Sequence, residues 1–385
     1  MTVDAGLVER VRRRLLDQGA TPTAARVAAE VRSEGVVLDD RGVLVLLGAV
    51  REDLAGAGVL EPLLRDPFVT DVLVNAPDEV WLDRGDGLVR AAVAFPDAAA
   101  VRRLAQRLAA TAGRRLDTAS PTVDARLSAG VRLHAVLPPV SPRGPLLSLR
   151  IPRRRAFSIV ELVAAGSLAA EMAEVLREVV RSRLAFLVTG GTGTGKTTVL
   201  STLLGEVDAT ERIVLVEDSG ELRPEHPHVV RLEARPPNVE GAGAVELRDL
   251  VRQALRMRPD RLVVGEVRGP EVVDLLAALN TGHDGGCGTV HANASASLPS
   301  RLEALAVAAG LGRAALHSQL AAGVQVVVHL ARGRDGQRAV SEVGVVERDV
   351  DTTVRVLPAL STGRGGHVQE GPGAARLAAL IAGPA

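Results

Sequence analysis

Lysine and cysteine are almost absent from this sequence of 385 residues. Lys196 is the only lysine among 46 basic residues, the other 45 being arginines, and Cys287 is the only cysteine. A single cysteine excludes an intramolecular disulfide, so nothing points to an oxidising compartment and we expect a cytoplasmic protein. A lone lysine marks a position where a compact ammonium group is needed and a planar guanidinium is not accepted.

Aromatic residues and long apolar runs are also scarce. The chain has no tyrosine, one tryptophan and four phenylalanines, which leaves little for stacking on nucleic-acid bases. Its formal net charge of zero excludes a generally basic surface, although 153–155 is a short run of arginines. The most apolar stretch, 43–50, is far below the roughly 20 residues that span a bilayer. We therefore expect no direct nucleic-acid partner, and membrane association only through other proteins.

The lysine lies in a glycine-rich motif that is typical of phosphate binding. The motif fits Gly-x4-Gly-Lys-Thr, in which backbone N–H groups cradle phosphates, the lysine neutralises their charge and the threonine reaches Mg²⁺. An apolar run at 184–188 predicts a strand before it, and 197–207 predicts a helix after it. The expected nucleotide-binding residues are Gly190, Gly191, Thr192, Gly193, Thr194, Gly195, Lys196, Thr197 and Thr198, with Thr197 on Mg²⁺.

Hydrophobic periodicity divides the chain into five segments. Strands expected near 184, 213, 229, 262, 288 and 324 alternate with helical stretches, which is the pattern of a doubly wound parallel sheet. The segments are a helical N-terminal lobe (1–55), a mixed α/β domain (56–151), a linker or hinge (152–157), an α/β nucleotide-binding domain (158–349) and a C-terminal tail (350–385) in which 374–381 is a last helix.

Acidic residues follow two expected strands of the nucleotide-binding domain. Glu217 and Asp218 end the β-branched run 213–216, which places them near Mg²⁺ or the attacking water; alternatively they begin a turn or pair with Arg223. Glu266 follows the strand 262–264, where a carboxylate can orient a water molecule that attacks the terminal phosphate. Gly265 before it permits close approach of the backbone.

A glycine-rich segment at 281–293 carries two histidines. His283, Asp284, Cys287 and His291 include zinc-binding residue types, but their spacing matches no common zinc framework. Three intervening glycines suit a phosphate-sensing loop better than a metal cage. We expect His291 to donate to the γ-phosphate as a neutral ring and His283 to contribute to nucleotide binding.

Together these segments resemble the secretion and pilus traffic ATPases of type II and type IV systems. The family's Walker A, Asp box, Walker B and His box would lie at 190–198, 213–222, 260–268 and 281–293. The stretches 232–241 and 252–269 look most like the tight-adherence (Flp) pilus and conjugal-transfer branch. The type II branch often carries a four-cysteine zinc module, which a chain with one cysteine cannot form.

The resemblance implies a fold and a set of site residues. The fold is α/β: a RecA-like doubly wound P-loop ATPase domain preceded by a smaller mixed α/β (PAS-like) domain and the helical lobe. In the family, arginines of the smaller domain reach the nucleotide's phosphates, and Arg132 and Arg150 fall at matching positions, with Arg126 a weaker candidate. The Asp box has Gly220 where the family usually has a bulkier residue, which leaves open whether Glu217 or Asp218 contacts Mg²⁺.

The resemblance also implies a function. The chain would be a homohexameric ATPase that uses ATP and Mg²⁺, and its domain closure would drive a polytopic inner-membrane platform protein of a pilus, secretion or conjugation system. It would lie in the cytoplasm, peripheral at the inner face of the cell membrane. A DNA-translocating ATPase of related fold and a nucleotide-gated assembly scaffold with little turnover remain alternatives.

Overall fold

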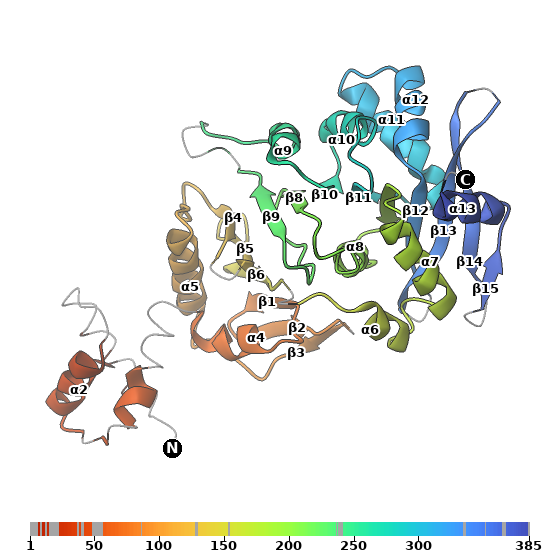
Figure 1. The fold of residues 1–385 in the computed structure, drawn as a ribbon. Helices are drawn as coiled ribbons and strands as arrows, with labels where there is room; N and C mark the ends of the chain where they lie inside the picture. Colours follow the sequence, from red (N-terminus) through yellow and green to blue (C-terminus); the bar gives the residue numbers. More distant parts are fainter. Residues whose placement is uncertain are drawn as a thin grey trace. The chain divides into compact units, whose positions relative to one another are not determined.

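The computed structural model divides into two compact units, Met1–Arg153 and Arg154–Ala385 (Figure 1). The boundary falls within the expected linker. The structure describes 57–363 and 367–383, except 86, 128, 129, 153, 154, 236, 238–241, 334, 335 and 351, together with 7, 10, 11, 14, 23–36, 38, 39 and 42–47.

The expected helical lobe has a small core of its own. Helix α2 (Ala24–Ser33) begins after Thr23, whose hydroxyl accepts a hydrogen bond from the backbone N–H of Arg26. Its apolar residues Val27 and Val31 are buried one turn apart and share a cluster with other lobe residues. The described members of this cluster include Leu7, Val11, Leu46 and Leu47.

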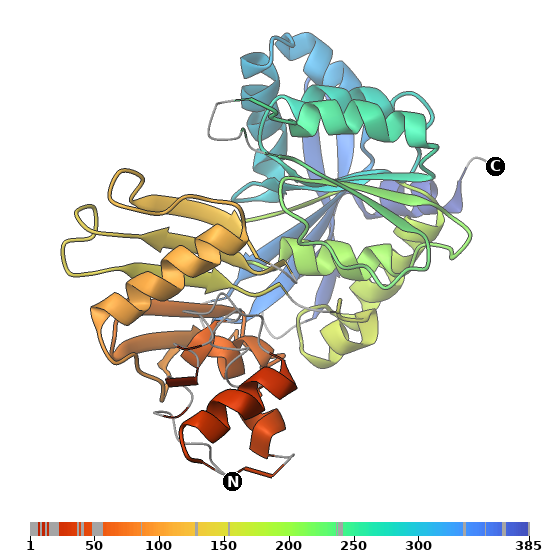
Figure 2. The same cartoon turned by 90° about the vertical axis from the view of Figure 1, so that its left-hand side faces the viewer.

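An antiparallel sheet forms the centre of the first unit. Alternating burial along β1 (Asp71–Ala76) and β2 (Glu79–Asp83) turns Val72, Val74, Val80 and Leu82 toward the core. Helix α5 (Ala98–Thr111), capped by Asp97, lies across one face of this sheet (Figure 2). In the order β3-β2-β1-β6-β5-β4 the strands are β3 (Leu88–Arg90), β2 (Glu79–Asp83), β1 (Asp71–Ala76), β6 (Leu146–Arg150), β5 (Arg132–Val136) and β4 (Thr122–Arg126), and η1 (Gly58–Leu60) and α4 (Glu61–Arg65) precede them.

The second unit contains a nine-stranded sheet in the order β15-β14-β13-β12-β7-β11-β10-β8-β9. Strands β12 through β9 in this order run parallel, which confirms the expected doubly wound sheet. Strand β7 is buried along its whole length, as expected of a central parallel strand. The parallel strands are β7 (Phe186–Gly190), β8 (Ile213–Glu217), β9 (Val229–Glu233), β10 (Arg261–Val267), β11 (Cys287–His291) and β12 (Val326–Arg332).

Helices cover both faces of this sheet, and each face has its own hydrophobic cluster (Figure 1). One face carries α6 (Ile159–Ala164), α7 (Ala170–Arg181), α8 (Lys196–Leu204) and α13 (Ala374–Ala382). The other carries α9 (Leu247–Ala254), α10 (Glu271–Leu279), α11 (Leu298–Ala308) and α12 (Arg313–Gly323), with η3 (Leu255–Met257) and η4 (Ser295–Ser297) between helices and strands. This layering leaves the ends of the parallel strands accessible, where open α/β sheets bind ligands.

The prediction of a separate tail at 350–385 is wrong. Strands β13 (Arg338–Arg348), β14 (Val354–Thr362) and β15 (Val368–Glu370) add antiparallel to the sheet, and α13 matches the expected last helix. Val354, Val356 and Ala359 are buried in the second unit's clusters. Pro358 made this stretch read as broken, but a bulge next to its partner Gly344 accommodates it.

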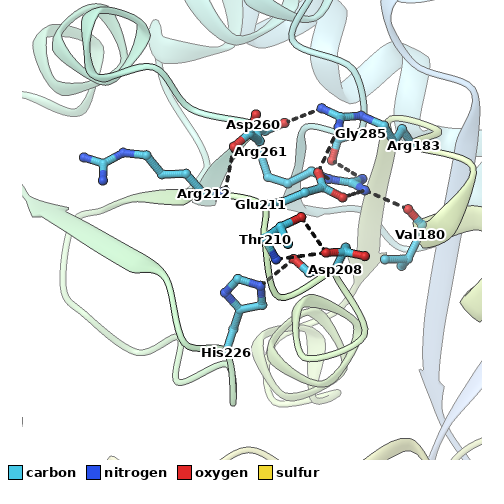
Figure 3. A network of polar contacts seen from close by, with 10 residues as sticks. All are labelled: Val180, Arg183, Asp208, Thr210, Glu211, Arg212, His226, Asp260, Arg261 and Gly285. Carbon is cyan, nitrogen blue, oxygen red and sulfur yellow. Dashed lines mark hydrogen bonds and ion pairs between the residues drawn. The ribbon is translucent and has the colours of Figure 1, made fainter.

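A buried ion pair holds together the edge of the sheet opposite the glycine-rich loop that carries Lys196 (Figure 3). Arg261 is 1% exposed, and its Nε and Nη2 lie 2.7 and 2.9 Å from the two carboxylate oxygens of Glu211. Nη2 also donates to the carbonyl oxygen of Val180 at 2.9 Å, and Arg183 reaches Glu211 at 3.1 Å. The network joins the starts of β8 and β10 to the end of α7.

Candidate nucleotide-binding site

The phosphate loop (190–197) connects the end of β7 to the start of α8. Gly190, Gly193 and Gly195 have φ of 150°, 71° and 96°, which side-chain-bearing residues rarely adopt. A Cβ on Gly190 would lie 2.6 Å from the carbonyl oxygen of Leu330 and 2.7 Å from Oγ1 of Thr194. Glycine is therefore required for this turn, which aims backbone N–H groups and the α8 N-terminus at one place.

Lys196 is folded onto the loop that carries it. The residue is 7% exposed, and its Nζ donates to the carbonyl oxygens of Gly190 and Gly191 at 3.0 and 2.8 Å. Burial lowers the pKa of Lys196, while the charge of Glu266 acts to raise it. An ammonium held by neutral carbonyl groups can exchange them for phosphate oxygens, so the residues present fit a bound triphosphate.

Glu266 and His291 come together beside this lysine. Nε2 of His291 lies 2.8 Å from Oε1 of Glu266, and Nδ1 of His291 lies 3.4 Å from Nζ of Lys196. His291 ends β11 directly opposite Gly190. Burial lowers the pKa of His291, the charge of Lys196 lowers it further, and Glu266 opposes both. The contacts fit a neutral ring with its proton on Nε2.

Arg268 joins the two acidic segments and was not predicted. Its Nη2 contacts Oδ2 of Asp218, and its Nη1 lies 3.8 Å from Oε2 of Glu266. The sequence held a signal for this contact, because Arg268 follows Glu266 by two residues at the end of β10 and so projects on the same side. Asp218 thus pairs with Arg268, whereas the Nη1 of the expected alternative Arg223 donates to the carbonyl oxygen of Leu222.

Glu217 is buried and partly committed to its own loop. It is 3% exposed, and its Oε1 accepts the backbone N–H groups of Glu221 and Leu222 at 2.8 and 2.9 Å. Burial raises the pKa of Glu217 against these bonds. Among the described residues its Oε2 finds no hydrogen-bond partner, so this atom can accept a ligand. A Cβ on Gly265 would lie 2.7 Å from Cγ of Glu217, so Gly265 provides the space for this side chain.

The structure does not bring His283 to the phosphate loop, which corrects the sequence-based expectation. Strand β11 runs parallel to β7 from Cys287, opposite Phe186, to His291, so a residue before the strand lies at the other edge of the sheet. There Nδ1 of His283 is 3.2 Å from the carbonyl oxygen of Ala278.

Within the described part of the chain no three metal-binding side chains cluster. Burial raises the pKa of the Cys287 thiol to about 12.

A cavity of about 350 Å³ adjoins the phosphate loop. Arg301 lines it, and the charge of Arg301 also lowers the pKa of His291. The sequence analysis assigned no role to Arg301 or Asn293. Arg301 lies outside every motif that was considered, and Asn293 is the last residue of the histidine-bearing segment 281–293. The lining residues are Gly191, Thr192, His291, Ala292, Asn293, Ser297 and Arg301.

The arginines expected to reach phosphates form a row in the first unit. Arg132 on β5 is the cross-strand partner of Arg150 on β6 and of Arg126 on β4. Asp124 lies 3.9 Å from Arg132. Like charges directly opposite each other destabilise a sheet, and carboxylates flank this row: Asp124 near Arg132, and Asp71 on β1 in register with Arg150.

A sequence profile described as "Type II/IV secretion system protein" matches residues 53–362. The chain belongs to this family. A Mycobacterium tuberculosis protein provisionally named a conjugal transfer protein is 56% identical over 335 residues, which are 86% of this chain and 95% of that protein. The conjugal transfer protein TrbB of Rhizobium radiobacter is 30% identical, over 71% of this chain and 83% of TrbB.

Two solved structures share the fold of this chain. The ATPase DotB of Yersinia pseudotuberculosis is 16% identical with a TM-score of 0.53, covering 79% of this chain and 80% of that one. The pilus retraction motor PilT with bound ADP is 18% identical with a TM-score of 0.51, covering 77% and 80%. These likenesses show that the chain shares the α/β fold of these structures. Over the described residues, every helix is too short or too polar to cross a bilayer.

Proposed function

We propose that this chain hydrolyses ATP and that the cycle drives a pilus, secretion or conjugation apparatus at the inner membrane. The observation that carries the proposal is the convergence of Lys196, His291 and Glu266 beside the phosphate loop. Phosphoryl transfer needs positioning and charge stabilisation more than covalent chemistry, and these three groups supply both.

Each residue has a role in this proposal. Lys196 and the loop amides hold the phosphates, Thr197 in the first turn of α8 binds Mg²⁺, and Glu266 orients the water and accepts its proton. His291 donates to the γ-phosphate. When bound, Mg²⁺ would supply positive charge that neutralises the phosphates. The unpartnered Oε2 of Glu217 supports Mg²⁺ or the water, and Asp218 acts through Arg268.

The arginine row gives the proposal its mechanical part. Arg132 and Arg150, kept side by side despite their like charge, would supply guanidinium groups to the phosphates of the bound nucleotide. Their engagement and release during turnover would close and open the domains about the hinge at 152–157. The names of these relatives favour a conjugation setting.

The ring and the membrane partner are further parts of the proposal. A homohexamer acting on a polytopic inner-membrane platform protein fits a peripheral cytoplasmic ATPase. Native mass spectrometry with ATPγS and Mg²⁺ should show a six-subunit species, and a chain that stays monomeric under all nucleotide conditions contradicts this part. Stimulation of turnover by added DNA would instead favour the DNA-translocating alternative.

A phosphate-release assay on the intact chain tests the enzymatic core. With ATP and Mg²⁺ the protein should release phosphate, and Glu266→Gln should retain ATP binding while kcat falls by about 100-fold or more. The control is Glu347→Gln, which removes a half-buried carboxylate that pairs with Arg355 outside the site. Equal turnover by the two variants would refute the role of Glu266, and no turnover by the unmodified chain would favour the scaffold alternative.

A further inference from the structure

A polar residue interrupts an apolar strand next to the phosphate loop. On β12 the residues at 326–328 and Leu330 are buried and apolar. His329 lies between them and is also buried, with 8% of its surface exposed, although it is polar. Thr189 on β7 is also buried, at 0%. Burying polar groups is costly unless they find hydrogen-bond partners, so such positions need a reason.

The first contact fixes the base of the phosphate loop. Oγ1 of Thr189 lies 2.9 Å from Nδ1 of His329, and the two residues are partners in the register of β7 and β12. Thr189 directly precedes Gly190, whose carbonyl oxygen accepts from Nζ of Lys196. The hydrogen bond between Thr189 and His329 therefore holds the backbone next to Gly190, whose carbonyl oxygen contacts Lys196.

The second contact fixes the segment that follows His291. Glu342 on β13 is the cross-strand partner of His329, and its Oε1 accepts a hydrogen bond from Oγ of Ser295. Ser295 is 4% exposed and begins η4, close in sequence to the cavity-lining residues Asn293 and Ser297. Burial lowers the pKa of His329, the charge of Glu342 acts to raise it, and the charge of Lys196 lowers it further.

We propose, resting on the nucleotide-binding function above, that Thr189, His329, Glu342 and Ser295 form a positioning relay. The relay holds the phosphate loop and the segment after His291 in one mutual arrangement. A diphosphate needs only the loop, whereas a triphosphate must reach the loop and His291 together. The relay therefore contributes to the preference for a nucleoside triphosphate over a diphosphate, and none of its members touches the nucleotide.

Calorimetric titration of the intact chain with ATPγS and with ADP tests this inference. Thr189→Val and His329→Leu should each weaken ATPγS binding by about fivefold, the effect of one lost hydrogen bond, while ADP affinity changes by less than about twofold. Thr189→Ser keeps the hydroxyl and His329→Asn places an amide near the Nδ1 position, so both should restore the ratio. The double variant Thr189→Val/His329→Leu should lose no more than the worse single variant.

A second buried histidine provides the matched control. His317 is 4% exposed and accepts from the backbone N–H of Val354 at 3.0 Å, outside the relay. His317→Leu should lower the melting temperature yet leave the ATPγS-to-ADP affinity ratio unchanged. If a core variant fails to fold, Ser295→Ala removes one hydroxyl at the far end of the relay and should give the same selective loss.

Two results would overturn the relay. Equal weakening of both nucleotides would show that these residues only stabilise the fold, and unchanged affinities would show that they have no role. An unmodified chain that binds neither ATPγS nor ADP would overturn the nucleotide-binding function itself, which separates the two failures.

Discussion

Nε2 of His291 lies 2.8 Å from Oε1 of Glu266, and the same ring lies 3.4 Å from the ammonium of Lys196. The imidazole thus sits between a carboxylate that would hold the water and a cation that would hold the phosphates. A ring in this place can change partners when the terminal phosphate arrives or leaves, because Nε2–H can donate to Glu266 or to a phosphate oxygen.

The pH profile of ATP turnover should reflect a neutral His291. Burial and the charges of Lys196 and Arg301 lower its pKa, and Glu266 opposes them. The ring then stays neutral down to a pH below the ordinary histidine value of about 6.5. We expect kcat/KM to be flat from neutral pH upward and to fall only below that value. In His291→Asn this acid limb should move, and a limb that stays in place assigns it to another group.

Lys196→Arg should abolish nucleotide binding almost as fully as Lys196→Ala. The ammonium packs against the carbonyl oxygens of Gly190 and Gly191 in a buried space, which a wider guanidinium does not fit. Equilibrium binding of a fluorescent ATP analogue measures the effect, and affinity should fall by about 100-fold or more. Near-normal binding by the arginine variant would contradict the requirement for a compact ammonium group.

Gly265→Ala should destabilise the second unit by about 1–3 kcal/mol, a usual cost of overpacking. The new Cβ would lie 2.7 Å from Cγ of Glu217, whose buried carboxylate cannot swing out without losing its bonds to the loop. Urea unfolding of the intact chain measures the loss. Adding Glu217→Ala removes the obstructing carboxylate, so the two substitutions together should cost less than the sum of each alone. Strict additivity would contradict the proposed clash.

Removing one partner of the buried ion pair between Arg261 and Glu211 should lower the stability of the fold more than replacing both partners with apolar residues. Arg261→Met alone leaves the carboxylate of Glu211 with Arg183 only, while Glu211→Gln leaves a buried guanidinium. Removing one partner of a buried ion pair typically costs about 3–5 kcal/mol, whereas replacing both is often close to neutral. Thermal denaturation of the two single variants and of Arg261→Met/Glu211→Leu tests this order, and a double variant less stable than both singles would reverse it.

Sequence reasoning predicted the glycine turn before Lys196 and the place of Glu266 near the end of a parallel strand, because local patterns determine both. An apolar strand, a glycine turn and a helix in succession fix where Lys196 lies, and parallel strands bring their carboxyl ends to one edge. The same reasoning failed for His283, because the sequence of a motif does not show where within it a strand begins and ends. Strand β11 starts at Cys287, so the two histidines of one segment lie at opposite edges.

Contacts between distant segments escaped prediction for a related reason. His329 pairs with Thr189 across 140 positions, and Arg268 pairs with Asp218 across 50. Nothing near His329 in the sequence points to Thr189, and the spacing of Arg268 from Glu266 places it on the side of Glu266 without pointing to Asp218. Strand β14 was missed because the hydrophobic periodicity fades after residue 349 in a stretch that contains glycine and proline, and the bulge that admits Pro358 opposite Gly344 is visible only in the structure.

The solitary lysine gives this chain an unusual handle for experiment. A lysine-specific endoproteinase has one cleavable bond, between Lys196 and Thr197, and the structure buries it at the first turn of α8. Cutting there requires that turn to unwind, so the rate of appearance of two fragments reports local opening of the nucleotide pocket. A single gel band splitting into two would follow that opening without any label.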